Sequence, residues 1–256
     1  MDADQLTGRF NGDLGTAVLV FLDEAIFAGD HKGAAVLKGR ITEPRLRIER
    51  KFCEAINVEN RLRIMAATNE QWAAPVEVSD RRYAVFDVSP ARAGDHAYFQ
   101  ALADQMNAGG REAMLFDLLA MDLTGFEVRA IPQTDARTDQ KLMSLRGVEG
   151  WLHEVLATGG FKFEHGWREW ADAGCEMPRA TAYEAYVAHV NLRREYRADT
   201  LTVWGKELRK ILGASIKDCR PGGVRSYIFG PLEECRTRFA RHIGEPNMRW
   251  GQGGEE

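Results

Sequence analysis

The clearest pattern in the chain is an unbroken apolar run that ends in two carboxylates. Residues 18–22 read Val-Leu-Val-Phe-Leu, and Asp23 and Glu24 follow at once. A run of this kind, rich in Val and Leu, is typical of a strand buried on both faces in a parallel sheet. Open α/β sheets bind their ligands at the carboxyl ends of such strands. The pattern therefore predicts a central strand with Asp23 and Glu24 at the ligand-binding edge.

Further strands are predicted in residues 45–67, on either side of a polar tip. Leu46 and Ile48 alternate with charged residues, whereas residues 62–67 form a more continuous apolar run. We therefore expect a half-buried strand followed by a more buried one. Residues 83–88 predict another strand.

Helical spacing appears before and after these strands. A short helix is predicted from His31, with Asp30 as its cap and Gly39 at its end. Two more helices are predicted from apolar residues at helical spacing, namely Tyr98, Leu102 and Met106 in the first and Phe116, Leu119, Ala120 and Leu123 in the second.

The last third of the chain predicts a separate unit. A helix around residues 183–190 and another over residues 201–212 precede two short strands, 216–219 and 224–229, joined by a Gly-rich turn, and a last helix follows over residues 232–243. Two helices followed by a hairpin is the order of a winged helix. We therefore expect an N-terminal α/β domain over residues 1–130, a linker over 131–150, a winged-helix-like α+β domain over 151–245 and a disordered tail over 246–256.

Composition narrows the possible functions. The chain has 256 residues and a formal net charge of -4, so any contact with nucleic acid has to come from a local basic patch. There is no apolar run of transmembrane length and no signal-peptide pattern, and we expect a cytoplasmic protein without a membrane partner. The cysteines never form Cys-x-x-Cys and the histidines are dispersed, which argues against a zinc site or a disulfide framework.

The apolar run with Asp23 and Glu24 also has the pattern of a Walker B strand. In such a site the Asp holds Mg²⁺ and the Glu polarises the water that attacks the γ-phosphate of ATP. One or two carboxylates are enough, because Mg²⁺ takes its other ligands from phosphate and water. A core strand that ends in a solvated acidic turn has the same pattern, so this stretch alone leaves both interpretations open.

The order of the motifs resembles the superfamily-three, AAA+-type helicase ATPase of phage and plasmid primase-helicases. The resemblance covers roughly residues 5–90 and is carried by the following segments: Leu6-Thr7-Gly8-Arg9-Phe10-Asn11, Phe21-Leu22-Asp23-Glu24-Ala25, Leu37-Lys38-Gly39-Arg40-Ile41-Thr42-Glu43-Pro44, Ile48-Glu49-Arg50-Lys51, Ala67-Thr68-Asn69 and Ser79-Asp80-Arg81-Arg82-Tyr83. It implies a partial AAA+-type parallel sheet, ATP and Mg²⁺ as cofactors, and a homo-oligomeric ring, expected to be a hexamer, around single-stranded DNA.

The resemblance also implies roles for individual residues. Asp23 is expected to bind Mg²⁺, Glu24 to activate water, and Asn69 to hold that water near the γ-phosphate. Arg81 or Arg82 is expected to be the arginine finger that reaches the site of the next subunit. Each has a simpler alternative, because Asn69 also suits a turn and the two arginines also suit a solvated surface.

Two basic groups are candidates for DNA binding. Lys38, Arg50 and Lys51 lie in the region that faces the ring pore in the family, although basic residues also protect an edge strand. In the winged-helix-like region the candidates are Lys206, Arg209, Lys210 and Arg225. Acidic neighbours there also fit a protein-docking domain whose basic residues are simply solvated.

The phosphate-binding loop of the family is missing. The sequence contains no Gly-x-x-x-x-Gly-Lys-Ser/Thr, and its one Gly-Lys pair, Gly205-Lys206, has neither the upstream glycine nor the hydroxyl. We therefore expect the C-terminal part of a phage-type replicative helicase or primase-helicase, completed by an upstream primase or P-loop segment. The alternative is a non-catalytic DNA-binding or assembly module that has lost the P-loop.

Overall fold

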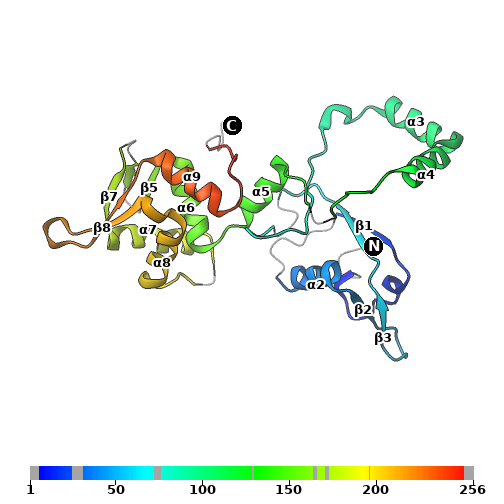
Figure 1. Cartoon of the computed structure of the whole chain (residues 1–256), viewed down its shortest axis with the longest axis horizontal. Helices are drawn as coiled ribbons and strands as arrows, with labels where there is room; N and C mark the ends of the chain where they lie inside the picture. The colour runs from blue at the N-terminus through cyan, green and yellow to red at the C-terminus, as the bar shows by residue number, and fades with distance from the viewer. Residues whose placement is uncertain are drawn as a thin grey trace.

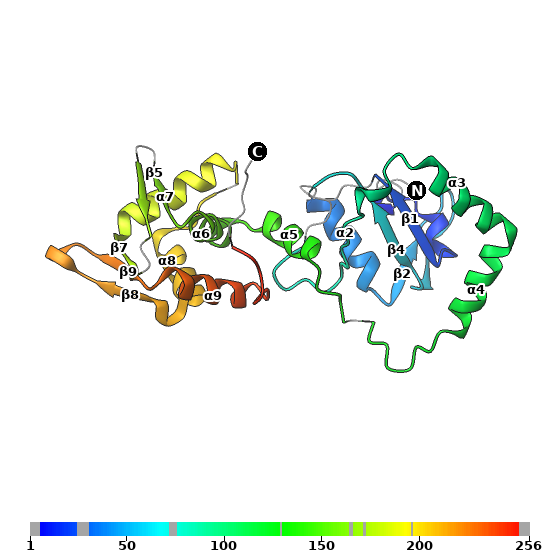
Figure 2. The ribbon, with the colours of Figure 1, turned by 90° about the horizontal axis from the view of Figure 1, so that it is seen from above.

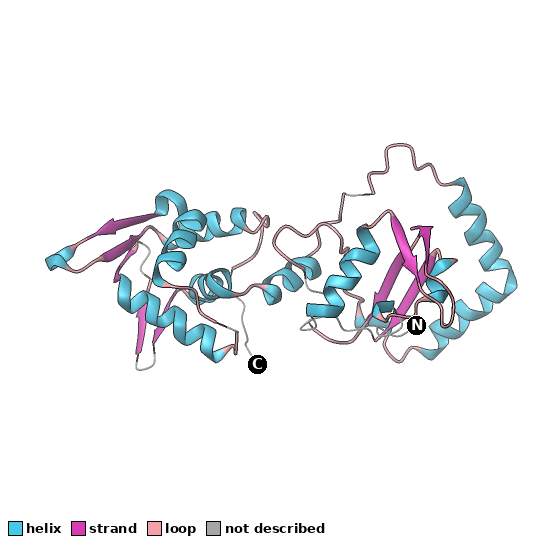
Figure 3. Ribbon diagram, turned by 90° about the horizontal axis from the view of Figure 1, so that it is seen from below, coloured by secondary structure: helices cyan, strands magenta, loops and turns pink. Residues whose placement is uncertain are grey.

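The computed structural model of the chain describes residues 6–24, 31–71, 76–128, 130–163, 166–170, 173–195 and 197–250. The fold is mixed α/β, with small sheets and helices in two lobes on either side of helix α5 (Figures 1 and 3). In chain order the elements are β1 (Leu19–Asp23), α2 (His31–Thr42), β2 (Arg45–Ile48), β3 (Ile56–Glu59), β4 (Arg63–Ala67), α3 (His96–Gln105), α4 (Arg111–Ala120), α5 (Asp135–Ser144), α6 (Gly147–Thr158), β5 (Gly160–Phe163), β6 (Gly166–Glu169), β7 (Cys175–Pro178), α7 (Arg179–Leu192), α8 (Leu201–Leu212), β8 (Ile216–Cys219), β9 (Ser226–Phe229) and α9 (Leu232–His242).

Each lobe has its own hydrophobic core. The N-terminal lobe, with β1–β4 and α2, buries a small aliphatic cluster: Leu6, Leu14, Val20, Leu22, Leu37, Leu46, Ile48 and Leu62. The C-terminal lobe, with α6–α9 and β5–β9, has a larger core rich in aromatic side chains: Trp151, Phe161, Trp170, Tyr186, Trp204, Tyr227, Phe229 and Phe239. Aromatic side chains bury the most area per residue, so the C-terminal lobe holds most of the apolar stabilisation.

The predicted strand over the apolar run is confirmed as β1, but its burial differs from the prediction. Val20 and Leu22 are buried, whereas Leu19 and Phe21 are 62% and 49% exposed. β1 pairs in parallel with β4 in a sheet of two strands. The face of β1 that carries Leu19 is exposed because no described element covers it.

Residues 45–67 contain three strands where two were predicted. β2 and β3 form an antiparallel pair, while β4 leaves this hairpin to join β1. The predicted polar tip instead contains β3, whose polar residues Asn57 and Glu59 face solvent. β4 is also more exposed than predicted, and its Met65 is 56% exposed.

Two other local predictions in the N-terminal half are wrong. Gly39 does not end its helix, because α2 continues to Thr42, whose hydroxyl donates to the Lys38 carbonyl at 2.8 Å; the predicted cap, Asp30, lies outside the described residues. Residues 83–88 do not form a strand, since they have no described strand beside them to pair with. Tyr83 instead packs against the N-terminal core.

The two helices predicted around residues 98–123 are confirmed as α3 and α4. A single turn, Met106–Gly110, joins them into an arm that stands beyond β1 in Figure 1 and runs around the lobe of β1 and β4 in the view of Figure 2. No residue of α3 or α4 is buried. The apolar residues that predicted the helices are therefore exposed to solvent, and Phe116 and Leu119 are 72% and 79% exposed.

The C-terminal lobe follows its predicted helices and hairpin closely. Helices α7, α8 and α9 and strands β8 and β9 all form within a few residues of their predicted bounds. The prediction missed α6 and strands β5, β6 and β7, and β7 adds a third strand to the hairpin in the order β7-β9-β8.

The stretch predicted as a linker, 131–150, is largely helical. It contains α5, which buries Arg137 and Lys141, and the start of α6. The first part of the predicted disordered tail is ordered, because Met248 and Trp250 pack against the C-terminal core. Residues 251–256 lie outside the described residues.

Candidate functional site

The parallel pairing of β1 with β4 brings three of the predicted site residues to one edge. Asp23, the last residue of β1, lies opposite Ala67, the last residue of β4. Glu24 follows Asp23 directly, Asn69 lies two residues beyond Ala67, and the side chains of Asp23, Glu24 and Asn69 are exposed. Since parallel strands point the same way, their following residues share the carboxyl edge of the sheet. Asp23, Glu24 and Asn69 are therefore neighbours at a position where a ligand can reach them.

The backbone at this edge adopts an uncommon conformation. Glu24 has a φ of 52°, one of three positive values among the described residues other than glycine. A left-handed non-glycine residue is energetically unfavourable, and such residues concentrate at functional sites. The chain therefore turns sharply at the point where the two carboxylates leave the strand.

The donors at this edge suit a magnesium–nucleotide complex in part. Two adjacent carboxylates match the hard oxygen ligands that Mg²⁺ prefers when phosphate and water complete its shell. No cluster of three or more potential metal-ligating side chains exists in the described part of the chain. The phosphate loop that ATP also needs is absent from the sequence.

The two candidate arginine fingers have different environments. Arg82 is paired with Asp80 at 2.9 Å, and the Asp80 side chain is fully buried. Arg137 of α5 donates to the Asp80 carbonyl at 2.6 Å, which ties this segment to the C-terminal half. Arg81 is exposed and, among the described residues, has no ion-pair partner. Arg81 is thus available to another molecule, while Arg82 is held in place.

Tyr83 lies beside this pair. Its burial, together with the negative charge of Asp80, raises the pKa of Tyr83 to about 12, so the phenol stays protonated at neutral pH. The described residues show no hydrogen bond or ion pair between residues 80–83 and the Asp23–Asn69 edge.

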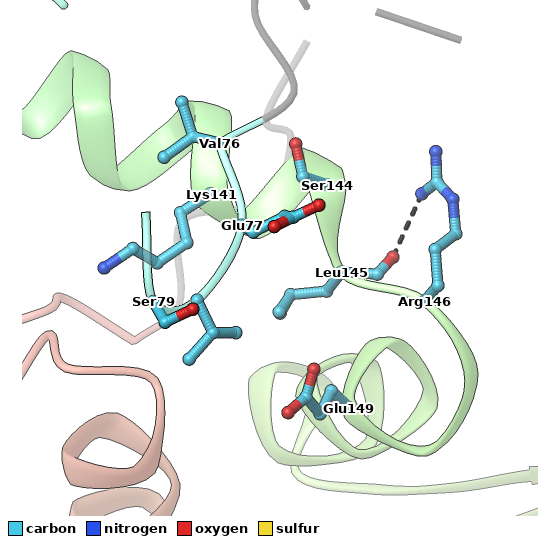
Figure 4. A pocket seen from close by; sticks show the side chains of 9 residues that line it. Val76, Glu77, Ser79, Lys141, Ser144, Leu145, Arg146 and Glu149 are labelled. Atoms are coloured by element: carbon cyan, nitrogen blue, oxygen red, sulfur yellow. Dashed lines mark hydrogen bonds between the residues drawn. The ribbon is translucent and has the colours of Figure 1, made fainter. Parts of the chain in front are cut away.

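A small pocket lies where residues 76–79 meet α5 and α6. It has a volume of about 280 Å³, and its lining, shown in Figure 4, consists of Val76, Glu77, Val78, Ser79, Lys141, Ser144, Leu145, Arg146 and Glu149. The ammonium group of Lys141 is already bound by Glu245 and by the Ile243 carbonyl. The charged side chains that line the pocket are therefore of both signs, and Lys141 is already bound within the protein. This lining does not favour a particular ligand.

The basic candidates of the N-terminal lobe divide into paired and exposed residues. Lys38 forms an ion pair with Glu77 at 2.5 Å, so most of its charge is compensated. The Arg50 side chain packs so closely on Gly12 that a Cβ there would lie 3.0 Å from its Cγ. Lys51 is exposed and lies 5.6 Å from the centre of the Phe10 ring.

The C-terminal candidates divide in the same way. Lys210 is paired with Glu207 at 3.0 Å, and Arg209 makes two contacts with Asp218 at 2.9 and 3.0 Å. Lys206 and Arg225 are exposed, and neither has a carboxylate partner within the described ranges.

Sequence reasoning missed Arg179, which lies with Arg209, Arg220 and Arg225 around one pocket. This pocket has a volume of about 570 Å³. Arg179 begins α7 and is 30 positions before Arg209 in the numbering, so no local pattern links it to the hairpin. Only the packing of α7 against the three-stranded sheet brings it there.

Comparison with known protein families gives a match over part of the chain only. A model described as a family of unknown function (DUF5906) matches residues 1–82, which is less than half of the chain. No curated protein sequence matches.

Solved structures give a likeness in fold. The apo structure of the NrS-1 C-terminal region (305-718) is 15% identical with a TM-score of 0.54, and the match covers 90% of this chain and 59% of that one. The A form of the apo C-terminal region is 16% identical with a TM-score of 0.52, covering 90% of this chain and 58% of that one. The chain therefore shares the fold of these regions and spans under two thirds of their length. In the described residues no helix is long and apolar enough to cross a membrane.

Proposed function

We propose that this chain is the C-terminal part of a phage-type replicative primase-helicase, in which ATP hydrolysis drives DNA unwinding by a ring. The observation that carries the proposal is the shared edge of β1 and β4, with Asp23, Glu24 and Asn69 beside one another. The likeness in fold to the NrS-1 C-terminal region supports it, since that likeness extends over both lobes.

In this proposal each of the three edge residues has its own role. ATP bound with Mg²⁺ would supply the phosphoryl group and the energy of its transfer to water. Asp23 would hold the ion, Glu24 would accept a proton from the attacking water, and the Asn69 amide would position that water through its donor and acceptor. The exposed position of all three side chains supports this assignment.

The arginine finger is assigned to Arg81. A finger has to reach a phosphate on a neighbouring subunit, which requires an uncommitted guanidinium. Arg81 meets this requirement, whereas Arg82 is bound to the buried Asp80. In this proposal Arg82 and Asp80 set the direction in which Arg81 points.

A further strand beside β4, carrying the phosphate-binding loop, is part of the proposal. The sheet of β1 and β4 has only two strands in the described chain, so the outer edge of β4 is unpaired there. Leu19 and Met65 are more than half exposed, although aliphatic residues on a strand ordinarily pack against another layer. An additional polypeptide segment on this sheet, from outside these 256 residues, would cover both.

The ring assembly is supported by the arm formed by α3 and α4. Its large apolar residues are exposed on both helices: Tyr98, Phe99, Leu102, Met114, Leu115, Phe116, Leu118 and Leu119. Large exposed apolar patches mark surfaces that bind other proteins. We propose that the arm packs on the adjacent copy in a hexamer.

The C-terminal lobe is proposed to be a winged-helix-like domain that contacts DNA. Helices α7 and α8 precede the hairpin of β8 and β9, which is the order that the motif requires. The pocket of four arginines between these elements also favours a second candidate, a non-catalytic DNA-binding module without ATPase activity.

The test is DNA-stimulated ATP hydrolysis, measured on these 256 residues alone and on the protein that includes a phosphate-binding loop. The isolated chain should hydrolyse ATP poorly, and the loop-containing protein should be active. Glu24→Gln should lower its turnover by at least about 10²-fold, because general-base catalysis is lost. Glu59→Gln is the matched control, since Glu59 pairs only with the exposed Arg61. A Glu24→Gln protein as active as the control would exclude the proposed role of this edge, and DNA binding without any ATPase activity would favour the second candidate.

A further inference from the structure

Four arginines from three separate elements surround one pocket of the C-terminal lobe. Arg179 begins α7, Arg209 lies on α8, and Arg220 and Arg225 flank the turn of the β8–β9 hairpin. The remaining lining residues are Asp218 and Cys219, and the volume is about 570 Å³. This space is large enough for a phosphate group with its hydration shell and for part of the molecule that carries it.

Tyr227 lies beneath two of these arginines. Its side chain is fully buried, and the guanidinium carbons of Arg179 and Arg209 lie 5.0 and 5.4 Å from the centre of its ring. Both distances are within the range of cation–π contacts. The ring therefore orients two positive charges toward the same pocket without neutralising either.

Gly205 allows these groups to converge. A Cβ on this residue of α8 would lie 2.7 Å from the Tyr227 hydroxyl and 3.6 Å from nitrogen atoms of both Arg179 and Arg209. Glycine is unfavourable inside a helix, and its presence is explained where other groups must approach the backbone closely. Gly205 therefore lowers the stability of α8 but lets the Tyr227 hydroxyl and the two arginines approach the helix backbone closely.

The polar groups at this point are incompletely satisfied. The Arg179 Nε atom is buried and has no hydrogen-bond partner among the described residues. Buried polar atoms are nearly always paired in native proteins, so exceptions call for a missing partner. A ligand with several acceptor oxygens would supply the hydrogen-bond partner that Arg179 lacks and would order the arginines around the pocket.

The charges of the pocket are not balanced. Asp218 is its one acidic lining residue, and both of its oxygens are bound by Arg209. Arg179, Arg220 and Arg225 have no carboxylate partner in the described parts of the chain. Arginine does not lose its proton in proteins, so the pocket keeps an excess of positive charge that an anion would neutralise.

We propose that this pocket binds a phosphate group of a nucleic-acid backbone. Guanidinium groups match phosphate oxygens in geometry and form charge-assisted hydrogen bonds with them. A polymer is favoured over an isolated anion because exposed Lys206 lies one helical turn from Arg209 on α8, where it can meet a neighbouring phosphate. The inference rests on the proposed role of this lobe in DNA binding and adds the residues that hold the backbone, including Arg179 and Arg220.

The experiment measures binding of a fluorescently labelled single-stranded oligonucleotide over a series of salt concentrations, in the full chain. Arg220→Gln and Arg225→Gln are the main variants, because both side chains are exposed and their loss should leave the fold intact. Each should weaken binding about tenfold and reduce the slope of log K against log salt by about one. Arg179→Gln should act likewise, with its folding checked by circular dichroism. Arg241→Gln, an exposed arginine on α9, is the control and should bind as the wild type does.

A second arm of the experiment identifies the source of the phosphate. Inorganic phosphate is titrated against the wild type and the variants at constant ionic strength, with thermal unfolding as the readout. Loss of oligonucleotide binding and of phosphate stabilisation in the pocket variants, but not in Arg241→Gln, supports the proposal. If the pocket variants lose only phosphate stabilisation, the pocket serves a free phosphorylated ligand and the nucleic-acid assignment is wrong. If they match the control in both measurements, or if the wild type binds neither probe, the pocket assignment is overturned, while the ATPase test with Glu24→Gln still decides the proposed function.

Discussion

Replacing Glu245 by Gln should destabilise the C-terminal lobe strongly, because Glu245 is the carboxylate partner of two buried cations. The chain reaches this position through Gly244, whose φ of 75° ends α9 and turns the backbone toward α5. One carboxylate oxygen contacts Arg137 at 3.2 Å and also contacts Lys141, and the other accepts from the Thr138 hydroxyl at 3.1 Å. Exposure of the three charged side chains is only 8%, 5% and 2% for Glu245, Arg137 and Lys141 respectively.

The magnitude follows from the charge balance of this group. Two cations and one carboxylate leave one excess positive charge, and Glu245→Gln leaves two in the same buried space. Removing one partner of a buried ion pair costs about 3–5 kcal/mol, since the remaining charge loses both its solvent and its counter-ion. Lys141→Met should cost less, about 1–2 kcal/mol, because Arg137 and Glu245 remain as a balanced pair and the main loss is the hydrogen bond to the Ile243 carbonyl.

Urea unfolding followed by tryptophan fluorescence measures this effect. Trp151, Trp170 and Trp204 are buried in the C-terminal core, so their emission follows this lobe even if the N-terminal lobe unfolds separately. The control is Glu233→Gln. Glu233 pairs with Arg236 at the surface, and its side chain is 75% exposed. This substitution should change the free energy of unfolding by less than about 1 kcal/mol. A Glu245→Gln protein as stable as the control, or more stable than Lys141→Met, would refute the charge-balance reasoning.

Two further predictions concern pH and assembly. Burial, with a smaller contribution from the positive charge of Arg193, lowers the pKa of His153 from 6.5 to about 4; the unfolded chain therefore binds the proton more strongly, and stability should fall as the pH drops from 7 to 5. The His153→Phe variant should lose about 2 kcal/mol less of its free energy of unfolding between pH 7 and pH 5, measured by urea unfolding at both pH values. Identical pH profiles of the wild type and the variant would contradict this prediction. On the arm, Leu119→Asp should weaken self-association by about 2 kcal/mol per interface, which light scattering would show as a lower mass. Asp117→Asn on the same helix is the control and should leave the mass unchanged. An unchanged mass for Leu119→Asp would show that the arm is not part of the assembly surface.

Prediction from the sequence succeeded where neighbouring residues decide the structure. Helix α8 forms over the predicted residues 201–212, with Gly213 at its end, and β8 forms over 216–219. The apolar run before Asp23 likewise forms a strand that ends at the two carboxylates. Periodicity and caps act within a few residues of each other, so they can be recognised without a partner.

Prediction failed where burial depends on what packs against an element. The pattern of β1 is the same whether both faces are covered or one, and the structure exposes Leu19 and Phe21. Residues 83–88 have a strand pattern but find no described strand to pair with. Arg137 and Lys141 look like residues of a polar linker, yet both are buried by α9 and the chain that follows it.

The sequence by itself determined the elements with clear local signals, such as α8 and β8, the place of Asp23 and Glu24 at the end of a strand, and the absence of a phosphate-binding loop from these residues. Tertiary structure alone decided that β4 pairs with β1 and so brings Asn69 to the same edge. It also decided that Arg179 meets Arg209 and the hairpin arginines around one pocket. The physical reason is that local preferences fix the conformation of short segments, whereas contacts between distant segments depend on which surfaces can be buried together.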